Sequence, residues 1–189
     1  TMDRLFTGKN SMKKWLLVVN PMSAGGRTQK RIPAIMKALK SNTNFDIEVR
    51  ETREKNHATA IVQEAASQGI DGIISLGGDG THNEVVTGFF NEEAELRNPE
   101  MALAVLPAGS GGDFARMLYP SRKPTRASES LRNATIQMID VGCCTLRNTS
   151  DVRFFLNVAS MGMGAEVVRS ANQGKKIFGG RLTYQFELF

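Results

Sequence analysis

Long apolar runs are absent from this sequence. The longest, such as "WLLVV" (15–19) and "ALAVL" (102–106), extend over only a few residues, whereas a helix that crosses a bilayer needs about 20. We therefore expect no membrane-spanning segment. Cysteine is also scarce, because Cys143 and Cys144 are the only two and are adjacent. Such a pair cannot form a disulfide framework, which favours two structural thiols on a strand and a reducing, cytoplasmic location.

Aromatic residues with polar groups are rare, with one Trp and two Tyr among 189 residues. The Lys and Arg residues are spread along the chain instead of forming one block, and they do not alternate with aromatic residues. This pattern argues against nucleic acid as a partner. The net charge of +5 favours smaller or flatter anionic partners, namely nucleotides, phosphates or acidic lipid surfaces.

Short apolar strands alternate with amphipathic helices over the first two thirds of the chain. We expect strands at 14–20, 45–51, 71–77 and 101–107, and helices at 28–40, at 56–69, from 82 and from 112. Continuous apolar strands separated by amphipathic helices are typical of strands buried on both sides. The sequence therefore predicts an α/β fold, an open and mostly parallel sheet with helices on both faces.

The pattern changes after a polar, proline-containing link at 119–130 and a short helix. Two strand-like segments at 136–146 and 153–164, joined by the polar turn "RNTSD", predict an antiparallel hairpin. We therefore divide the chain into an extension or expression remnant (1–11), an α/β domain (12–134) and the beginning of a β-rich substrate domain (135–189). Two strands bury little surface alone, so we expect this second domain to be truncated.

Three glycine-bearing turns follow strands of the expected sheet: "NPMSAGGR" (20–27), "GGDGTHNE" (77–84) and "LPAGSGGDFAR" (106–116). In open parallel sheets, ligands bind at the carboxyl ends of the strands. Glycine allows close approach of the backbone, and the helix N-terminus that follows attracts phosphate. Neither the Walker pattern nor the dinucleotide fingerprint is present. The three turns together predict a phosphate-bearing ligand held mainly by backbone and hydroxyl groups.

Asp79 lies in the middle of the second turn, where its carboxylate would repel a bound phosphate unless a cation lies between them. A Mg²⁺ ion, held directly or through water, explains such an acid. The alternative is that Asp79 caps the helix that it precedes.

Five segments, "NPMSAGGR", "GGDGTHNEVV", "PAGSGGDFAR", "IDVG" and "FLNVASMGMGAEV", occur in an order that resembles the bacterial diacylglycerol kinase and lipid kinase family. Its catalytic domain is shared with sphingosine and ceramide kinases. GGDGT alone also occurs in NAD kinases and phosphofructokinases, but the Asn-Pro turn and the "DFAR" segment resemble the lipid kinases. The resemblance covers about 13–189 and implies a two-domain enzyme. Such an enzyme transfers the γ-phosphoryl group of ATP to a hydroxyl of a diacylglycerol-like lipid, with Mg²⁺ and with transient peripheral contact at the inner face of the membrane.

The resemblance also implies roles for individual residues. Nucleotide-contacting positions are Asn20, Pro21, Met22, Ser23, Ala24, Thr52, Gly78, Asp79, Gly80, Thr81, His82, Asn83, Glu84 and Ser110. Asp79 is the catalytic acidic position, and Asp79, Asp113 and Asp140 match acids that organise magnesium through water. The family's general base, a glutamate, belongs to a later segment that these 189 residues do not contain, so we expect this chain alone to be inactive.

The chain departs from the family pattern at several positions. Ala24, Ser110 and Gly112 stand where the family usually has Gly, Thr and Asn, and an alanine is less free than glycine to adopt positive φ. His82 occupies a usually aliphatic position, where it would contact a phosphate or lie at the helix surface. Two alternatives stay open: a kinase for a soluble acceptor such as NAD, and a nucleotide-binding module without catalysis. The sequence does not identify the acceptor.

Overall fold

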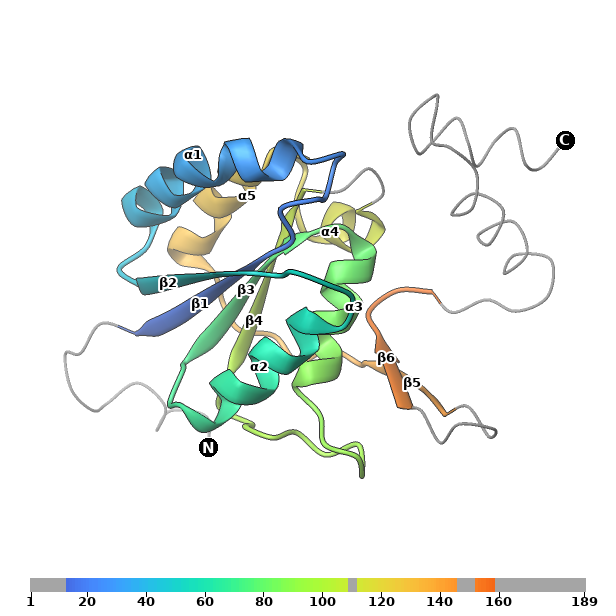
Figure 1. Cartoon of the computed structure of the whole chain (residues 1–189). Coiled ribbons are helices and arrows are strands. Elements are labelled where there is room, and N and C mark those ends of the chain that lie inside the picture. The colour runs from blue at the N-terminus through green and yellow to red at the C-terminus, as the bar shows by residue number, and fades with distance from the viewer. Residues whose placement is uncertain (1–12, 109–111, 146–151, 159–189) are drawn as a thin grey trace, which may run out of the picture.

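Four parallel strands form the centre of the protein. The structure is a computed structural model and describes residues 13–108, 112–145 and 152–158. The strands lie in the order β2-β1-β3-β4 (Figure 1). Their bounds are Lys14–Val19 for β1, Asp46–Glu51 for β2, Gly72–Gly77 for β3 and Ala102–Pro107 for β4. The predicted parallel α/β sheet is confirmed.

Helices cover both faces of this sheet, as Figure 1 shows. One face packs against α1 (Arg27–Asn42), α5 (Pro124–Ala127) and the 3-10 helix η2 (Ser128–Asn133). The other face packs against α2 (His57–Ser67) and α3 (Asp79–Gly88), with the short α4 (Asp113–Leu118) beside β4.

Alternating residues of the inner strands β1 and β3 enter the two cores. In β1, Leu17 and Val19 belong to the core under α1, whereas Leu16 and Val18 belong to the core under α2 and α3. All four side chains are at most 1% exposed. Burial on both sides explains why these inner strands are almost wholly apolar. The edge strand β2 alternates apolar and charged residues instead, because only Ile47 and Val49 pack on the core under α1.

The strands end at a common level, which fixes the position of the loops that follow. Val19 at the end of β1 lies opposite Glu51 of β2 and Leu76 of β3. The chain goes from β1 to β2 on one side and then to β3 on the other side of β1. Such a reversal of strand order opens a crevice at the carboxyl ends of β1 and β3, the usual ligand position in open α/β sheets.

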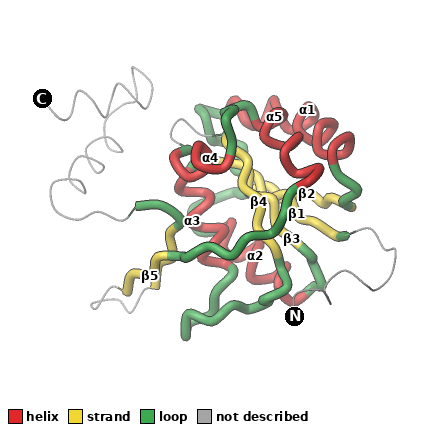
Figure 2. Tube along the Cα trace, turned by 180° about the vertical axis from the view of Figure 1, so that it is seen from behind, coloured by secondary structure: helices red, strands yellow, loops and turns green. Residues whose placement is uncertain are grey.

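A small antiparallel hairpin lies beside α3. It consists of β5 (Gly142–Thr145) and β6 (Val152–Phe155). Phe154 of β6 stacks on Phe90 with ring centroids 4.3 Å apart. Figure 2 shows the segment before β5 running from the α5 side of the sheet past β4 to the α3 side. The predicted turn at 147–151 lies outside the described residues, and the division into two domains stays a prediction.

Several predicted boundaries were wrong. Helix α3 begins at Asp79 instead of residue 82, so the acid and Gly80 are in its first turn. Helix α5 begins at Pro124, within the segment expected to be a link, because proline suits the first turn of a helix and Ala127 is buried. The strand predicted at 136–146 is shortened to Gly142–Thr145, since the preceding residues cross past β4 without pairing. Cys143 and Cys144 lie on this strand and are exposed.

No helix among the residues that the structure describes is long and apolar enough to span a bilayer.

Candidate functional site

A side-chain hydrogen bond joins the first two glycine-bearing turns across the crevice. Asn20 follows β1, and its Nδ2 donates to Thr81 Oγ1 in the first turn of α3 at 3.1 Å. The Asn20 Oδ1 accepts from the backbone N–H of Met22 at 3.0 Å, which fixes the side chain within its own turn. The two turns are thus held side by side, as predicted for parts of one site.

Thr28 connects the first turn to the segment after β4, a role that the sequence did not indicate. It lies in the first turn of α1 and is 0% exposed. Its Oγ1 lies 2.6 Å from Ser23 Oγ and 3.4 Å from the Ala108 carbonyl oxygen. The hydroxyl therefore links Ser23 to the third turn. Its only signal in the sequence is the position directly after the Gly-Gly-Arg that closes the first turn.

Asp79 joins the second turn to the third. Its carboxylate accepts from the backbone N–H of Gly112 at 2.8 Å and from that of Asp113 at 3.1 Å. These N–H groups belong to the N-terminus of α4, so Asp79 caps α4. Asp79 does not cap its own helix α3, whose N-cap residue is Gly78. Asn157 after β6 donates to the same carboxylate at 3.4 Å. Asp79 is therefore the point where two turns and the hairpin meet.

The acids predicted to organise magnesium are only partly brought together. Asp113 contacts the Asp79 carboxylate through its backbone N–H, while its own carboxylate forms an ion pair with Arg116. Asp140 is exposed in the segment before β5. Within residues 13–108, 112–145 and 152–158, no group of three or more His, Cys, Asp or Glu residues gathers as metal ligands do. A single carboxylate such as that of Asp79 can still suit Mg²⁺, which takes one or two carboxylates together with phosphate oxygens and water. The metal site stays a prediction.

His82 lies inside the protein, so its predicted place at the helix surface was wrong. The side chain is 1% exposed, and Nδ1 lies 2.7 Å from Ser75 Oγ of β3. Nε2 has no hydrogen-bond partner among the described residues. Burial lowers the pKa of His82 from 6.5 to about 4, an effect that the Asp79 charge and the Gly77 backbone oppose in part. The imidazole is neutral at pH 7 and anchors the first turn of α3 to β3.

The next residues of α3 lie between the crevice and the hairpin. Asn83 Oδ1 accepts from the backbone N–H of Leu156 at 3.2 Å, so this side chain holds the end of β6. The Glu84 carbonyl oxygen accepts from Thr59 of α2 at 2.8 Å. Thr52 extends the β1–β2 ladder by donating its N–H to the Val19 carbonyl at 2.8 Å, which places it beside the first turn. Ser110 lies outside the described residues.

The glycines of the second turn divide into two kinds. At Gly77, an added Cβ would lie 2.5 Å from the Thr81 Cβ, so this glycine is needed for packing. At Gly80, an added Cβ would meet nothing within 4 Å. Gly80 is exposed, and the first N–H groups of a helix have no partner within it, so the backbone at Gly80 is accessible to a ligand. This is the geometry expected for a backbone that receives phosphate.

The first turn contains consecutive residues with left-handed backbone. Ala24, Gly25 and Gly26 have φ of 54°, 68° and 80°. Alanine therefore adopts the conformation for which the family usually has glycine. An L-residue in this region costs about 1 to 2 kcal/mol, so we expect the alanine at position 24 to lower the stability of the protein.

Replacing Ala24 by glycine is expected to raise the free energy of unfolding by about 1 kcal/mol, because the left-handed strain is removed. Urea denaturation followed by circular dichroism measures this difference. Ala34 is the matched control, since it is exposed within α1 and Ala34→Gly should lower the same quantity by about 0.5 to 1 kcal/mol. An equal fall in the free energy of unfolding of Ala24→Gly and Ala34→Gly would contradict backbone strain at Ala24.

Comparison with known proteins assigns the family. The profile of the diacylglycerol kinase catalytic domain matches residues 14–144, which contain β1 to β4, all three turns and most of β5. The chain belongs to the diacylglycerol kinase catalytic domain family. The resemblance inferred from the motifs is thereby confirmed.

Individual relatives agree with this assignment. The chain is 30% identical to a diacylglycerol kinase of Bacillus subtilis over 174 residues, which are 92% of this chain and 54% of that protein. It is 26% identical to a sphingoid long-chain bases kinase 1 of Arabidopsis thaliana, over 89% of this chain and 22% of that protein. The crystal structure of a diacylglycerol kinase from Bacillus anthracis superposes with a TM-score of 0.64 at 26% identity, covering 96% of this chain and 58% of the other. The chain thus spans about half the length of these bacterial relatives.

Proposed function

We propose that this chain forms the nucleotide-binding part of a lipid kinase that transfers the γ-phosphoryl group of ATP to a hydroxyl of a diacylglycerol-like lipid. The observation that carries the proposal is the joining of three glycine-bearing turns at the switch point of the sheet, through Asn20, Thr81 and Asp79. Family membership supports a phosphotransferase, and similarity to a diacylglycerol kinase and to a sphingoid long-chain bases kinase supports a lipid acceptor. The proposal includes a cytoplasmic location with peripheral membrane contact.

The residues of the crevice have separate tasks in this proposal. The open first turn of α3 at Gly80 receives phosphate oxygens, and Asn20 keeps Thr81 directed toward the first turn. Ser23 and Thr28 fix the first turn against the third. Phosphoryl transfer depends mainly on positioning and on neutralisation of charge, which is what a rigid set of turns provides.

Asp79 and Asp113 would hold a Mg²⁺ ion, directly or through water. The ion would neutralise charge on the transferred phosphoryl group. The hydrogen bonds that the Asp79 carboxylate accepts from Gly112, Asp113 and Asn157 use only part of its capacity, since a carboxylate has about four acceptor positions. Asp79 therefore fits both the cap of α4 and a metal-bound water. No described residue is assigned as the general base.

The test compares acceptors with labelled ATP and Mg²⁺ in the natural polypeptide that contains these residues. We expect label on diacylglycerol in mixed vesicles and none on NAD or fructose 6-phosphate. Calorimetric titration of the present chain with ATP and Mg²⁺ accompanies the assay and should detect binding. Label on a soluble acceptor alone would overturn the lipid assignment, and binding without any transfer would indicate a module without catalysis.

A further inference from the structure

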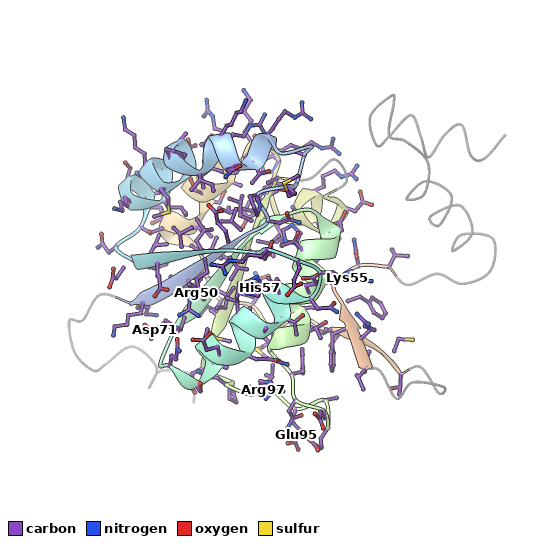
Figure 3. All side chains as sticks on the ribbon, viewed as in Figure 1. Arg50, Lys55, His57, Asp71, Glu95 and Arg97 are labelled. Atoms are coloured by element: carbon purple, nitrogen blue, oxygen red, sulfur yellow. The ribbon has the colours of Figure 1, made fainter. Side chains whose placement is uncertain are left out.

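The charges of this protein are separated between the two helical layers. Every charged residue of α1 is basic. In Figure 3, nitrogen-tipped side chains project from α1 on the side away from the labelled Glu95. The same layer adds basic residues before α5 and within α5 and η2. Glu129 is the acidic residue of these two helices. These exposed basic residues are Arg27, Lys30, Arg31, Lys37, Lys40, Arg122, Lys123, Arg126 and Arg132. We call this set the basic face.

Acidic residues gather on the opposite layer. Helices α2 and α3 contain no Lys or Arg, and the loop that follows α3 is rich in glutamate. The acids of α2, α3 and this loop are Glu64, Asp79, Glu84, Glu92, Glu93, Glu95 and Glu100, and Arg97 is the basic residue among them. A protein with this distribution has an electrostatic dipole that turns the basic face toward an anionic surface and the acidic layer away from it.

The charges of α1 are available to an external partner. Lys30 and Lys37 are seven residues apart and so lie on the same side of the helix, opposite the buried Ile35 and Leu39. Within the described residues, no ion pair joins Lys30, Arg31, Lys37 or Lys40 to an acid. The helix is about 24 Å long, and its long aliphatic stems can lie along a surface while their charged ends stay solvated.

We propose that the basic face docks this protein on an anionic lipid bilayer. The proposal rests on the proposed lipid kinase function, because an acceptor that resides in a bilayer requires the enzyme to approach it. A layer of helices lying flat on a sheet presents a broad charged surface that complements lipid headgroups. Helix α1 begins directly after the first turn of the crevice, so docking through α1 brings this turn to the edge of the membrane.

The face is less suited to nucleic acid. Its helices lie against their own sheet instead of protruding as a recognition helix does. The exposed residues of α1 include no aromatic side chain on which bases could stack. Binding to nucleic acid is therefore an outcome that would contradict the proposal.

The test is sedimentation of the chain with vesicles of phosphatidylglycerol and with vesicles of phosphatidylcholine, without ATP or diacylglycerol. We expect binding to the anionic vesicles only. Each Lys near such a surface contributes about fivefold, so Lys30→Gln/Lys37→Gln should weaken binding by about 30-fold. Raising NaCl from about 0.05 M to about 0.5 M should also release the protein, because the Debye length shortens.

The matched control is Lys14→Gln/Lys55→Gln, which removes the same charge from exposed positions outside the basic face and should change vesicle binding by about threefold or less. Circular dichroism checks that all variants are folded. Equal losses in the two double variants, or binding to duplex DNA or RNA with no binding to vesicles, would overturn the proposal. Since no phosphoryl transfer is measured, vesicle binding without kinase activity would refute the proposed function and leave the docking surface standing.

Discussion

Acidification is expected to destabilise this protein through His82. Between about pH 7.5 and about pH 4.5, this residue alone should lower the free energy of unfolding by roughly 2 to 3 kcal/mol. The pKa of the buried imidazole is about 4 in the folded protein, below the 6.5 of an unfolded chain. The unfolded state therefore binds more protons in this range, and stability is lost as the pH falls from 6.5 toward 4. Urea unfolding midpoints at several pH values measure the loss.

The matched variant for this prediction is Ser75→Ala/His82→Leu. It removes both partners of the buried hydrogen bond and so leaves no polar group unsatisfied at that place, a change that can be nearly neutral for stability. The variant should retain the pH dependence of the carboxylates but lack the contribution of His82. The same slope of stability against pH in wild type and variant would refute the assignment to His82.

Replacing Asp79 by alanine is expected to have two effects. The first N–H groups of α4, at Gly112 and Asp113, lose their acceptor, so the free energy of unfolding should fall by about 1 to 3 kcal/mol. Phosphoryl transfer by the natural polypeptide should also fall below detection, because the proposed magnesium position loses its carboxylate. Denaturation and the labelled ATP assay measure these effects separately.

Asp79→Asn and Asp113→Ala separate the two roles. Asparagine keeps one oxygen that can accept from α4, so stability should recover in part while phosphoryl transfer stays absent. Asp113 is 62% exposed in its side chain and pairs with Arg116, so Asp113→Ala should change stability by about 0.5 kcal/mol or less. Near-normal phosphoryl transfer in Asp79→Ala would refute the catalytic assignment, whereas unchanged stability would refute the capping of α4.

The hydrophobic pattern determined most of the fold. The four strands lie close to their predicted bounds. Strands buried on both faces need continuous apolar residues, whereas the edge strand β2 shows the alternation of a strand buried on one face. The three glycine-bearing turns follow β1, β3 and β4 as expected. The boundaries that failed depended on more distant contacts. Pro124 begins a helix because Ala127 packs on the core under α1, and α3 begins at Asp79, where His82 of its first turn is hydrogen-bonded to Ser75 of β3.

Only the tertiary structure decided which hydrogen-bond partners the polar side chains have. The sequence by itself determined the family, the parallel sheet and the turns that would hold phosphate, because these depend on local pattern and motif order. It did not determine that Asp79 caps α4, that His82 is buried against Ser75, or that Asn83 holds the end of β6. These bonds join residues of different elements, and strand order and packing bring them together. A hydrogen bond forms only within about 3 Å, a distance that no local pattern of residues specifies.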